Sequence, residues 1–353
     1  MSSSPRAGIK SLLVVAMLWI LLWTPACIVD AQTLAAGFFV KELFGCSMCY
    51  SKMTAVANYR DVCDEIRDQS VDIAGLAIEP TDMIIPPSCR CQGSSIPLLS
   101  VPMIGTAMVL AYHDPGCAKP SLKLPNSAIA GIYNGNITNW NQLEGCANVD
   151  LPITLCERCD NSMQQAAFTR SLKCMGVEIP NEPCCAPGVG FSDFMSHATC
   201  ASVGGSQEGD CVRGGQPRAN RVHGDIVRCT TGIRGSIAAF RYCDFLMETS
   251  GAKAFQLQTA GGRWVKPTRH EVRRGVHNSN CGNQCLPTDG WPIIVIPRMM
   301  YRSRGYGSQA STIRSTCKDT VRNNCFCGGF DCYFPIPRAC RMASLEACRQ
   351  IAA

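Results

Sequence analysis

The sequence predicts an α/β fold reinforced by disulfide bonds, and three observations lead to this prediction. Short β-type runs alternate with helical patterns along the 353 residues, an arrangement that favours parallel or mixed sheets covered by helices. The length allows two domains, or two lobes of one fold. The 25 cysteines are the third observation. Because a chain of this size can bury a core without them, we expect them to reinforce the fold.

The predicted strands are apolar or β-branched runs bounded by turn residues. In chain order they cover 70–78, 96–113, 151–157, 235–241 and 291–301. The predicted helices cover 39–44, 58–69, 126–135, 162–174 and, directly after a strand, 242–248. Gly135 is expected to end its helix, because glycine reaches the left-handed conformation of a helix stop without strain.

Three segments are expected to be irregular or only locally ordered. Residues 86–95 form a turn-rich linker, and 178–222 are rich in Gly, Pro, Cys and Asn. From Ser308 onward the sequence becomes polar, with a cysteine every few residues, which predicts a disulfide-tied tail over 308–353.

The first 31 residues have the pattern of a cleavable secretory signal. Arg6 and Lys10 precede the apolar run 12–23, and Ala31 marks the expected cleavage position. The run is about a dozen residues long, whereas a membrane span needs roughly 20. We therefore expect a secreted, extracellular protein without a transmembrane segment of its own.

Cysteine usage agrees with export. Removing Cys27 with the signal leaves an even number, which favours up to twelve disulfides in an oxidising compartment. Adjacent Cys184 and Cys185 are expected to choose different partners, given the spacing that a disulfide needs. The five histidines are scattered and no cysteine spacing resembles a zinc site. We expect no metal, no cofactor and no catalytic cysteine.

The net charge of +6 is modest and spread along the chain. Its densest cluster, 269–274, is typical of a solvated helix face. Nucleic acid is disfavoured as a partner, because no basic stripe with interleaved aromatic residues occurs. A small anion suits a mildly basic chain.

Residues 157–168, "ERCDNSMQQAAF", form the main candidate site. Arg158 offers a planar fork that matches an oxyanion, Asp160 can hold that fork, and the Ser162 hydroxyl can donate. The first N–H groups of the following helix lack partners within the helix and favour an anion. In the alternative interpretation Asp160 or Asn161 only caps a surface helix, and Arg158 is solvated.

Several segments, taken in order, resemble the phosphate-binding proteins of bacterial phosphate ABC transporters. The sharpest is "IAGIYNGNITNWNQL" (129–143), which is similar to that family's helix, Gly and Trp hallmark. The others are 70–80, 101–112, 157–168, 232–245, 260–272 and 290–301. Together they cover about 70–301, and their shared order carries the resemblance.

The resemblance implies a type II periplasmic-binding-protein-like fold, in which two α/β lobes are joined by crossover strands and close on a ligand. Lobe 1 would comprise 32–108 and 286–307, and lobe 2 would comprise 109–285. The tail 308–353 would lie outside both. The family binds its ligand and catalyses no reaction, so we expect no enzyme.

The resemblance also assigns ligand-binding roles, residue by residue. Arg158, Asp160 and Ser162 match the family's binding loop, whereas Met163 replaces its Gly and Gln164 replaces its Thr. The Gly lets an oxyanion approach the backbone closely, so Met163 either points away or restricts access.

The first lobe departs further from the family's pattern. Phe38 and Asn58 fall at its first two binding loops, but the glycines of the second loop are gone. Ala77 stands nearest the place of the Asp that accepts a hydrogen bond from protonated phosphate, and Glu79 follows two residues later. Asp72 matches a different, structural Asp of the family.

Three hypotheses for the function follow. The first is an exported protein that binds phosphate or a related small oxyanion, with or without a membrane transporter as partner. The second is an extracellular, disulfide-rich scaffold or interaction protein, with an extracellular-matrix partner, that kept the fold but has a degenerate site. The third, a hydrolase, lacks a nucleophile motif such as G-x-S-x-G. Asn136, in the sequon Asn136-Ile137-Thr138, is a predicted glycosylation site.

Overall fold

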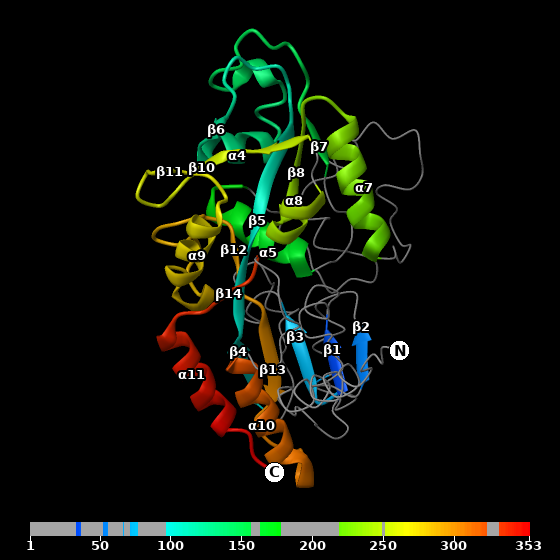
Figure 1. Cartoon of the computed structure of the whole chain (residues 1–353), viewed down its shortest axis with the longest axis vertical. Coiled ribbons are helices and arrows are strands. Elements are labelled where there is room, and N and C mark those ends of the chain that lie inside the picture. Colours follow the sequence, from blue (N-terminus) through cyan, green and yellow to red (C-terminus); the bar gives the residue numbers. More distant parts are fainter. Residues whose placement is uncertain are drawn as a thin grey trace, which may run out of the picture.

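The fold is described from a computed structural model, which covers residues 33–36, 52–55, 66, 71–76, 97–156, 163–177, 219–248, 251–322 and 332–353. Two sheets divide the molecule along its long axis (Figure 1). One sheet occupies the lower half in that view and the other occupies the upper half, and β5 and β12 rise between them.

The lower sheet, named here the N-terminal sheet, has five strands in the order β2-β1-β3-β13-β4. These strands are β1 (Thr33–Ala36), β2 (Lys52–Ala55), β3 (Ile73–Leu76), β4 (Leu98–Pro102) and β13 (Arg298–Arg302). β1 pairs in parallel with β2 and β3, whereas β13 runs antiparallel between β3 and β4. The last strand of this sheet therefore comes from the far end of the sequence.

The upper sheet, named the central sheet, is built around β5. Its strands are β5 (Ile104–His113), β7 (Thr154–Cys156), β8 (Ser236–Arg241), β9 (Ala252–Ala254), β12 (Ile294–Val295) and β14 (Phe334–Pro335). β8, β9, β12 and β14 all run antiparallel to β5, and β7 lies parallel to β8. A small sheet of β6 (Lys123–Leu124), β10 (Gln256–Gln258) and β11 (Trp264–Val265) lies beside it.

Among the described residues, consecutive strands pass directly from one sheet to the other at two places, which we call the crossover. On the outward path the chain changes sheet at Met103, between β4 and β5, and on the return path it does so at Ile296–Pro297, between β12 and β13. The N–H of Met103 donates to the carbonyl of Pro297 over 3.0 Å. The run 96–113 is therefore two strands rather than one long strand, as is 291–301.

The two joined halves confirm the expected type II fold with crossover strands. The exact lobe limits stay a prediction. The expected limit at 108/109 falls inside β5, five residues beyond the change of sheet at Met103.

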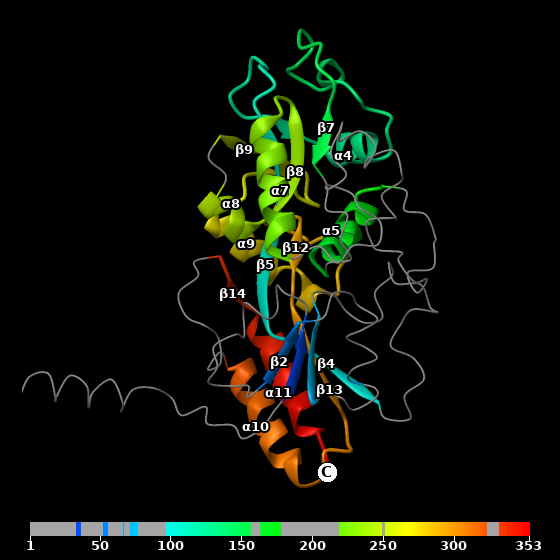
Figure 2. The same ribbon diagram turned by 90° about the vertical axis from the view of Figure 1, so that its right-hand side faces the viewer.

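Helices cover both halves. Those of the upper half are α4 (Asn126–Tyr133), η2 (Trp140–Gln142), α5 (Met163–Cys174), α7 (Ala219–Gly232), α8 (Tyr242–Glu248), α9 (Arg269–His277) and η4 (Asn280–Gly282). Those of the tail are η5 (Gly307–Gln309), α10 (Ala310–Val321) and α11 (Arg338–Arg349). Figure 2 shows α10 and α11 beside the N-terminal sheet and α7 along β8.

Most predicted elements are confirmed, and one is wrong in part. Gly135 ends the α4 region with a φ of 77°, as expected. The range 178–222 was expected to be irregular, but its last residues, from Ala219, begin α7. The rest of that range, the predicted helix 39–44 and most of 58–69 lie outside the described residues; Ile66 is helical.

The core runs through both halves. β5 is buried at every position but its last, and Trp140, Trp291, Tyr112 and Phe255 are fully buried. Tyr112 packs against Trp140 and Phe255, with ring centroids 5.9 and 4.5 Å apart. The apolar core is therefore substantial, which agrees with disulfides that reinforce it.

Six disulfides occur within the described residues. They are Cys117–Cys146, Cys156–Cys229, Cys174–Cys285, Cys243–Cys332, Cys281–Cys340 and Cys317–Cys348. Four of these six involve residues beyond 280, so among the described residues the C-terminal region carries most of the crosslinks. Cys184 and Cys185 lie outside the described residues.

Across the part of the chain that the structure describes, no helix is long and apolar enough to cross a membrane.

Candidate functional site

The candidate site centres on the β7–α5 unit. β7 ends at Cys156, and α5 begins at Met163, so the predicted binding loop joins the end of a strand to the start of a helix. Arg158, Asp160 and Ser162 themselves lie outside the described residues. Met163 and Gln164 form the start of α5, and their side chains are not among those described.

The surroundings of α5 place this helix N-terminus where α/β sheets bind ligands. β7 runs parallel to β8 in the central sheet, and the carboxyl ends of such strands, beside helix N-termini, are the usual ligand positions. Phe168 and Leu172 fix α5 on the core and are fully buried. In both views α5 lies close to the level where the two halves meet (Figures 1 and 2).

Disulfides anchor both sides of the loop. Cys156, the last residue of β7, is bonded to Cys229 of α7, and Cys174, the last residue of α5, is bonded to Cys285. Beside the second bond, the Arg170 guanidinium donates to the carbonyl of residue 284 over 2.8 Å. The strand and the helix that carry the loop are therefore covalently held to two other parts of the chain.

On the other side of the expected ligand, Phe38, Asn58, Ala77 and Glu79 lie outside the described residues. Asp72 is described, and it has a structural role, as expected. Its carboxylate lies 3.8 Å from the Arg302 guanidinium, and its carbonyl accepts a 2.9 Å hydrogen bond from the Tyr306 hydroxyl. Burial raises the pKa of Tyr306 to about 12, so the donor stays protonated.

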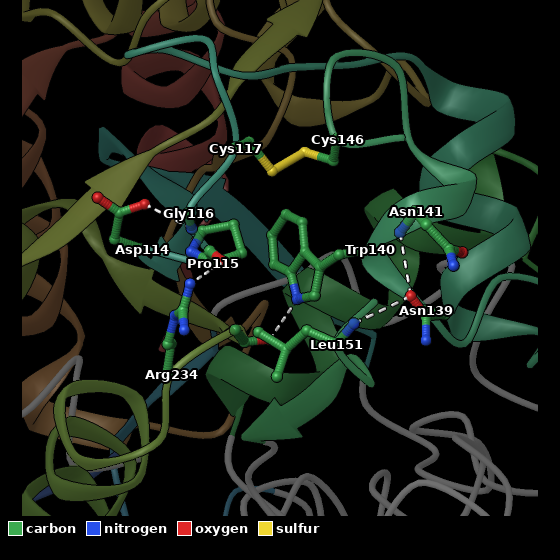
Figure 3. The surroundings of a disulfide bond; sticks show 11 residues. Asp114, Pro115, Gly116, Cys117, Asn139, Trp140, Asn141, Cys146, Leu151 and Arg234 are labelled. Atoms are coloured by element: carbon green, nitrogen blue, oxygen red, sulfur yellow. Dashed lines mark hydrogen bonds between the residues drawn. A yellow bond between two sulfur atoms is a disulfide. The ribbon is translucent and has the colours of Figure 1, made fainter. Parts of the chain in front are cut away.

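The hallmark segment around Trp140 has a structural role (Figure 3). Asn139 caps η2 by accepting from the N–H of Asn141 over 3.0 Å. The Trp140 indole N–H donates to the carbonyl of Gly235 over 2.8 Å, and the Cys117–Cys146 disulfide closes the region nearby. The sequence motif thus ties the segment after α4 to the turn that precedes β8.

Asn136 lies at the turn beyond Gly135. Asn136 and Thr138 are both exposed, and the N–H of Asn136 donates to the carbonyl of Gly131 over 2.8 Å. The predicted sequon therefore sits on a surface turn that is held by the end of a helix.

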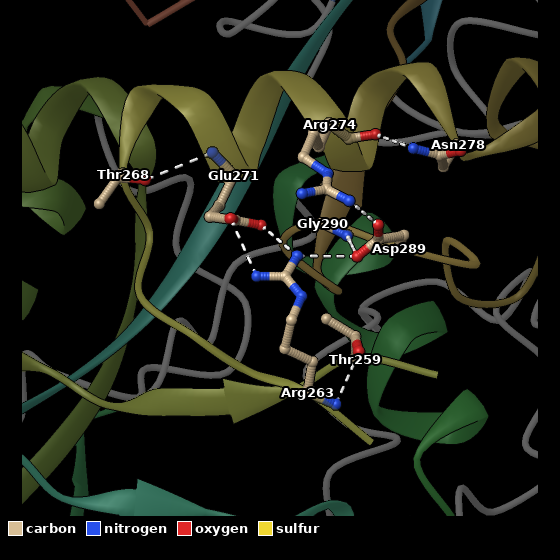
Figure 4. A network of polar contacts seen from close by, with 8 residues as sticks. All are labelled: Thr259, Arg263, Thr268, Glu271, Arg274, Asn278, Asp289 and Gly290. Atoms are coloured by element: carbon tan, nitrogen blue, oxygen red, sulfur yellow. Dashed lines mark hydrogen bonds and ion pairs between the residues drawn. The ribbon is translucent and has the colours of Figure 1, made fainter. Parts of the chain in front are cut away.

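A charged network on α9 escaped sequence reasoning (Figure 4). Arg263 donates to both carboxylate oxygens of Glu271, over 3.0 and 2.8 Å, and to Asp289 over 2.8 Å. Arg274 also pairs with Asp289. Hydrogen bonds from the Arg263 side chain and the Gly290 backbone lower the pKa of Asp289 to about 2.

The network changes the interpretation of the basic cluster 269–274. Arg269 and Arg273 are exposed, as predicted for a solvated face. Arg274, however, is paired within the chain, and so is Arg263, which belongs to the preceding hairpin. No short sequence window contains all four charges, so no local pattern could have revealed the network.

Two α/β halves, a double crossover and a helix N-terminus at the end of a strand define a two-lobed binding-protein fold. The chain belongs to the family described as the PBP superfamily domain, whose model matches residues 33–268. This confirms the family resemblance and agrees with a binding protein rather than an enzyme.

Solved structures of the same fold support this assignment. The chain is similar to PfluDING, a high-affinity periplasmic phosphate-binding protein bound with phosphate, at 14% identity, 92% coverage of this chain, 99% of that chain and a TM-score of 0.57. A human phosphate-binding apolipoprotein shows 14% identity, coverages of 89% and 93% and a TM-score of 0.56. A phosphate-binding protein from Stenotrophomonas maltophilia shows 14% identity, coverages of 90% of this chain and 93% of that chain, and a TM-score of 0.54. No curated protein sequence matches the chain.

Proposed function

We propose that the protein is an exported binding protein for phosphate or a related small oxyanion. The observation that carries the proposal is the start of α5 directly beyond β7, where the family's binding loop would lie. The similar structures named above are phosphate-binding proteins by description, which supports an anion as the ligand.

The proposed clamp combines a charge with backbone donors. Arg158 would form a bidentate contact with the oxyanion, Asp160 would orient the guanidinium, and Ser162 would donate its hydroxyl. The first N–H groups of α5, from Met163 and Gln164, would supply further donors, aided by the helix dipole. The disulfides at Cys156 and Cys174 support this assignment, because they fix both elements that carry the loop.

The opposite wall of the proposed site would be contributed by Phe38 and Asn58. In the family, an Asp accepts the hydrogen bond from protonated phosphate. Ala77 stands nearest to the position of that Asp and cannot accept one, and Glu79 follows two residues later. We therefore expect weak discrimination between phosphate and sulfate.

Titration calorimetry with inorganic phosphate tests the proposal. The wild-type protein should release or absorb heat with a saturable isotherm, and Arg158→Ala should weaken binding by at least about tenfold, equivalent to about 1.4 kcal/mol. Lys173→Ala, in the last turn of the same helix, is the matched control and should bind as the wild type does. Equal binding by Arg158→Ala would refute the clamp, and no binding by the wild type would refute the ligand.

The second candidate function is an extracellular scaffold with a degenerate site. Met163 in place of the close-approach Gly favours it, as does a tail crosslinked to the rest of the fold. Under this candidate the protein would bind neither phosphate nor sulfate, and Met163→Gly would not restore binding.

Export and glycosylation complete the proposal. Twelve cysteines paired in six disulfides within the described residues fit an oxidising exterior, and cleavage of the signal is proposed near Ala31. We assign a glycan to Asn136, whose turn is exposed. Expression in a eukaryotic secretory host should give a product that loses mass on glycosidase treatment, and Asn136→Gln should abolish that loss. Affinity capture from such a host would test for a transporter or matrix partner.

A further inference from the structure

We propose that the C-terminal segment Cys332–Ala353, named here the strap, fixes the orientation of the two halves by spanning the crossover. The crossover has two strands of the chain at Met103 and Ile296–Pro297. Any opening or closing of the halves must bend the chain at both places. The strap is attached on both sides of them.

Its first residues are attached to the central sheet. Cys332 is bonded to Cys243 of α8. The Thr106 hydroxyl donates to the carbonyl of Cys332 over 2.9 Å, and β14 pairs with β5 through Phe334 and Pro335. These contacts hold the strap to the strand that leaves the crossover upward.

Its remaining residues return to the N-terminal sheet. In α11, the buried Ser344 hydroxyl donates to the carbonyl of Pro102, the last residue of β4, over 3.0 Å. The N–H of Ala352 donates to the carbonyl of Ser303, just beyond β13, over 2.8 Å. Figure 1 shows α11 beside β4 and β14 above it, next to β5. The strap therefore contacts the chain on both sides of Met103, at Pro102 of β4 and at Ile104–Thr106 of β5.

A second disulfide fastens the middle of the strap to the return path. Cys340 of α11 is bonded to Cys281 of η4, which precedes β12. The carbonyl of Cys281 accepts a 2.7 Å hydrogen bond from Arg298, the buried first residue of β13. The segment from η4 to β13, which contains the return path at Ile296–Pro297, is thus held at one end by the Cys281–Cys340 disulfide and at the other by the buried side chain of Arg298.

These attachments oppose a hinge motion for a geometric reason. The halves cannot rotate about the crossover unless the distances from Cys243 and Cys281 to β4 change, and the strap fixes those distances. The two disulfides and the β14–β5 pairing hold the strap to the upper half, so a rotation would have to break the hydrogen bonds of Ser344 to Pro102 and of Ala352 to Ser303. The proposal is independent of what the protein binds, and it implies a ligand site of nearly constant aperture.

Distance measurement between the halves tests the strap. A dye pair on noncanonical amino acids at exposed Lys266, directly after β11 in the upper half, and exposed Ser308, beyond β13, needs no cysteine for labelling. Single-molecule energy transfer in buffer should give one narrow distance for the wild-type protein. Two populations or a broad distribution would overturn the proposal without any further variant.

The same measurement on disulfide variants separates the strap from general stiffness. Replacing Cys243, Cys332, Cys281 and Cys340 together by Ser should broaden the distribution or shift it. Cys281→Ser/Cys340→Ser serves as a milder variant should the fourfold replacement fail to fold. The control, Cys117→Ser/Cys146→Ser, removes a disulfide far from the crossover and should keep the narrow distance. A folded strap variant with the wild-type distribution would overturn the proposal.

Discussion

The indole nitrogen of Trp140 donates to the carbonyl oxygen of Gly235 over 2.8 Å, across 95 residues of sequence. This bond joins the family's hallmark segment to the start of β8, and both residues are buried. We expect Trp140→Phe to lose the bond and part of the ring packing, and so at least about 1 kcal/mol of unfolding free energy. Trp140→Ala, which also leaves a cavity, should lose about 3–5 kcal/mol.

Equilibrium denaturation measures both losses. Trp264→Phe is the matched control, because Trp264 is only partly buried and contacts Lys123 through its ring. Its effect should stay below about 1 kcal/mol. A control as damaging as Trp140→Phe would contradict the role assigned to the Trp140 bond.

Gly275 allows α9 to lie directly against the segment that enters β12. A Cβ at this position would lie 2.4 Å from the carbonyl oxygen of Trp291 and 2.8 Å from Ile294. Since the first of these atoms is backbone, Gly275→Ala should destabilise the fold by about 1–3 kcal/mol. Gly232→Ala, at the end of α7 where a Cβ meets nothing within 4 Å, should be neutral or slightly stabilising. Thermal unfolding would distinguish the two, and equal melting temperatures would refute the close approach.

Asp289 makes stability depend on pH in the acid range. Its folded-state pKa of about 2 lies below the ordinary 3.8, so its contribution is present above the ordinary value and is lost as the pH falls towards 2. Asp289→Asn should cost less than about 1 kcal/mol near neutral pH, because the pairs with Arg263 and Arg274 are partly exposed.

Melting curves at pH 2–5 check this prediction. The wild type should lose more thermal stability than Asp289→Asn does over that interval, since only the wild type has the titrating carboxylate. Parallel losses in the two proteins would contradict it.

The Cys156–Cys229 disulfide should support ligand binding as well as the fold. Cys156→Ser/Cys229→Ser removes a crosslink between residues 73 apart and should cost about 2–5 kcal/mol of stability. It should also weaken phosphate binding, because the loop after β7 loses one of its anchors. Cys117→Ser/Cys146→Ser should lose stability but keep its phosphate affinity. Titration calorimetry with phosphate on both folded variants tests this prediction. Unchanged phosphate affinity in Cys156→Ser/Cys229→Ser would show that this disulfide does not support the proposed site.

Local patterns predicted those elements that local chemistry determines. The strand 236–241, running into α8, follows from an apolar run that changes to a helical pattern, and Gly135 follows from the conformation of a helix stop. The candidate helix after β7 was predicted from local signals as well, because its capping residues directly precede a run with helical apolar spacing.

Local sequence patterns could not predict features that depend on contacts between residues far apart in the chain. The change of sheet at Met103 could not be read, because the residues on both sides are equally apolar and only pairing with β13 or β8 separates them. The pairing of Cys243 with Cys332 depends on the folded path of the tail. Helix α7 was not predicted because Gly224, Thr230 and Thr231 are weak helix formers. The two threonine hydroxyls are satisfied by carbonyls one turn earlier, at 2.8 Å each.

The crosslinks of the tail also set an order of events for the newly made chain. Cys243, Cys281 and Cys317 find their partners only at 332, 340 and 348. A product that stops before Cys332 would therefore carry three thiols with no native partner into an oxidising compartment. Those thiols would be available for mixed disulfides with other proteins.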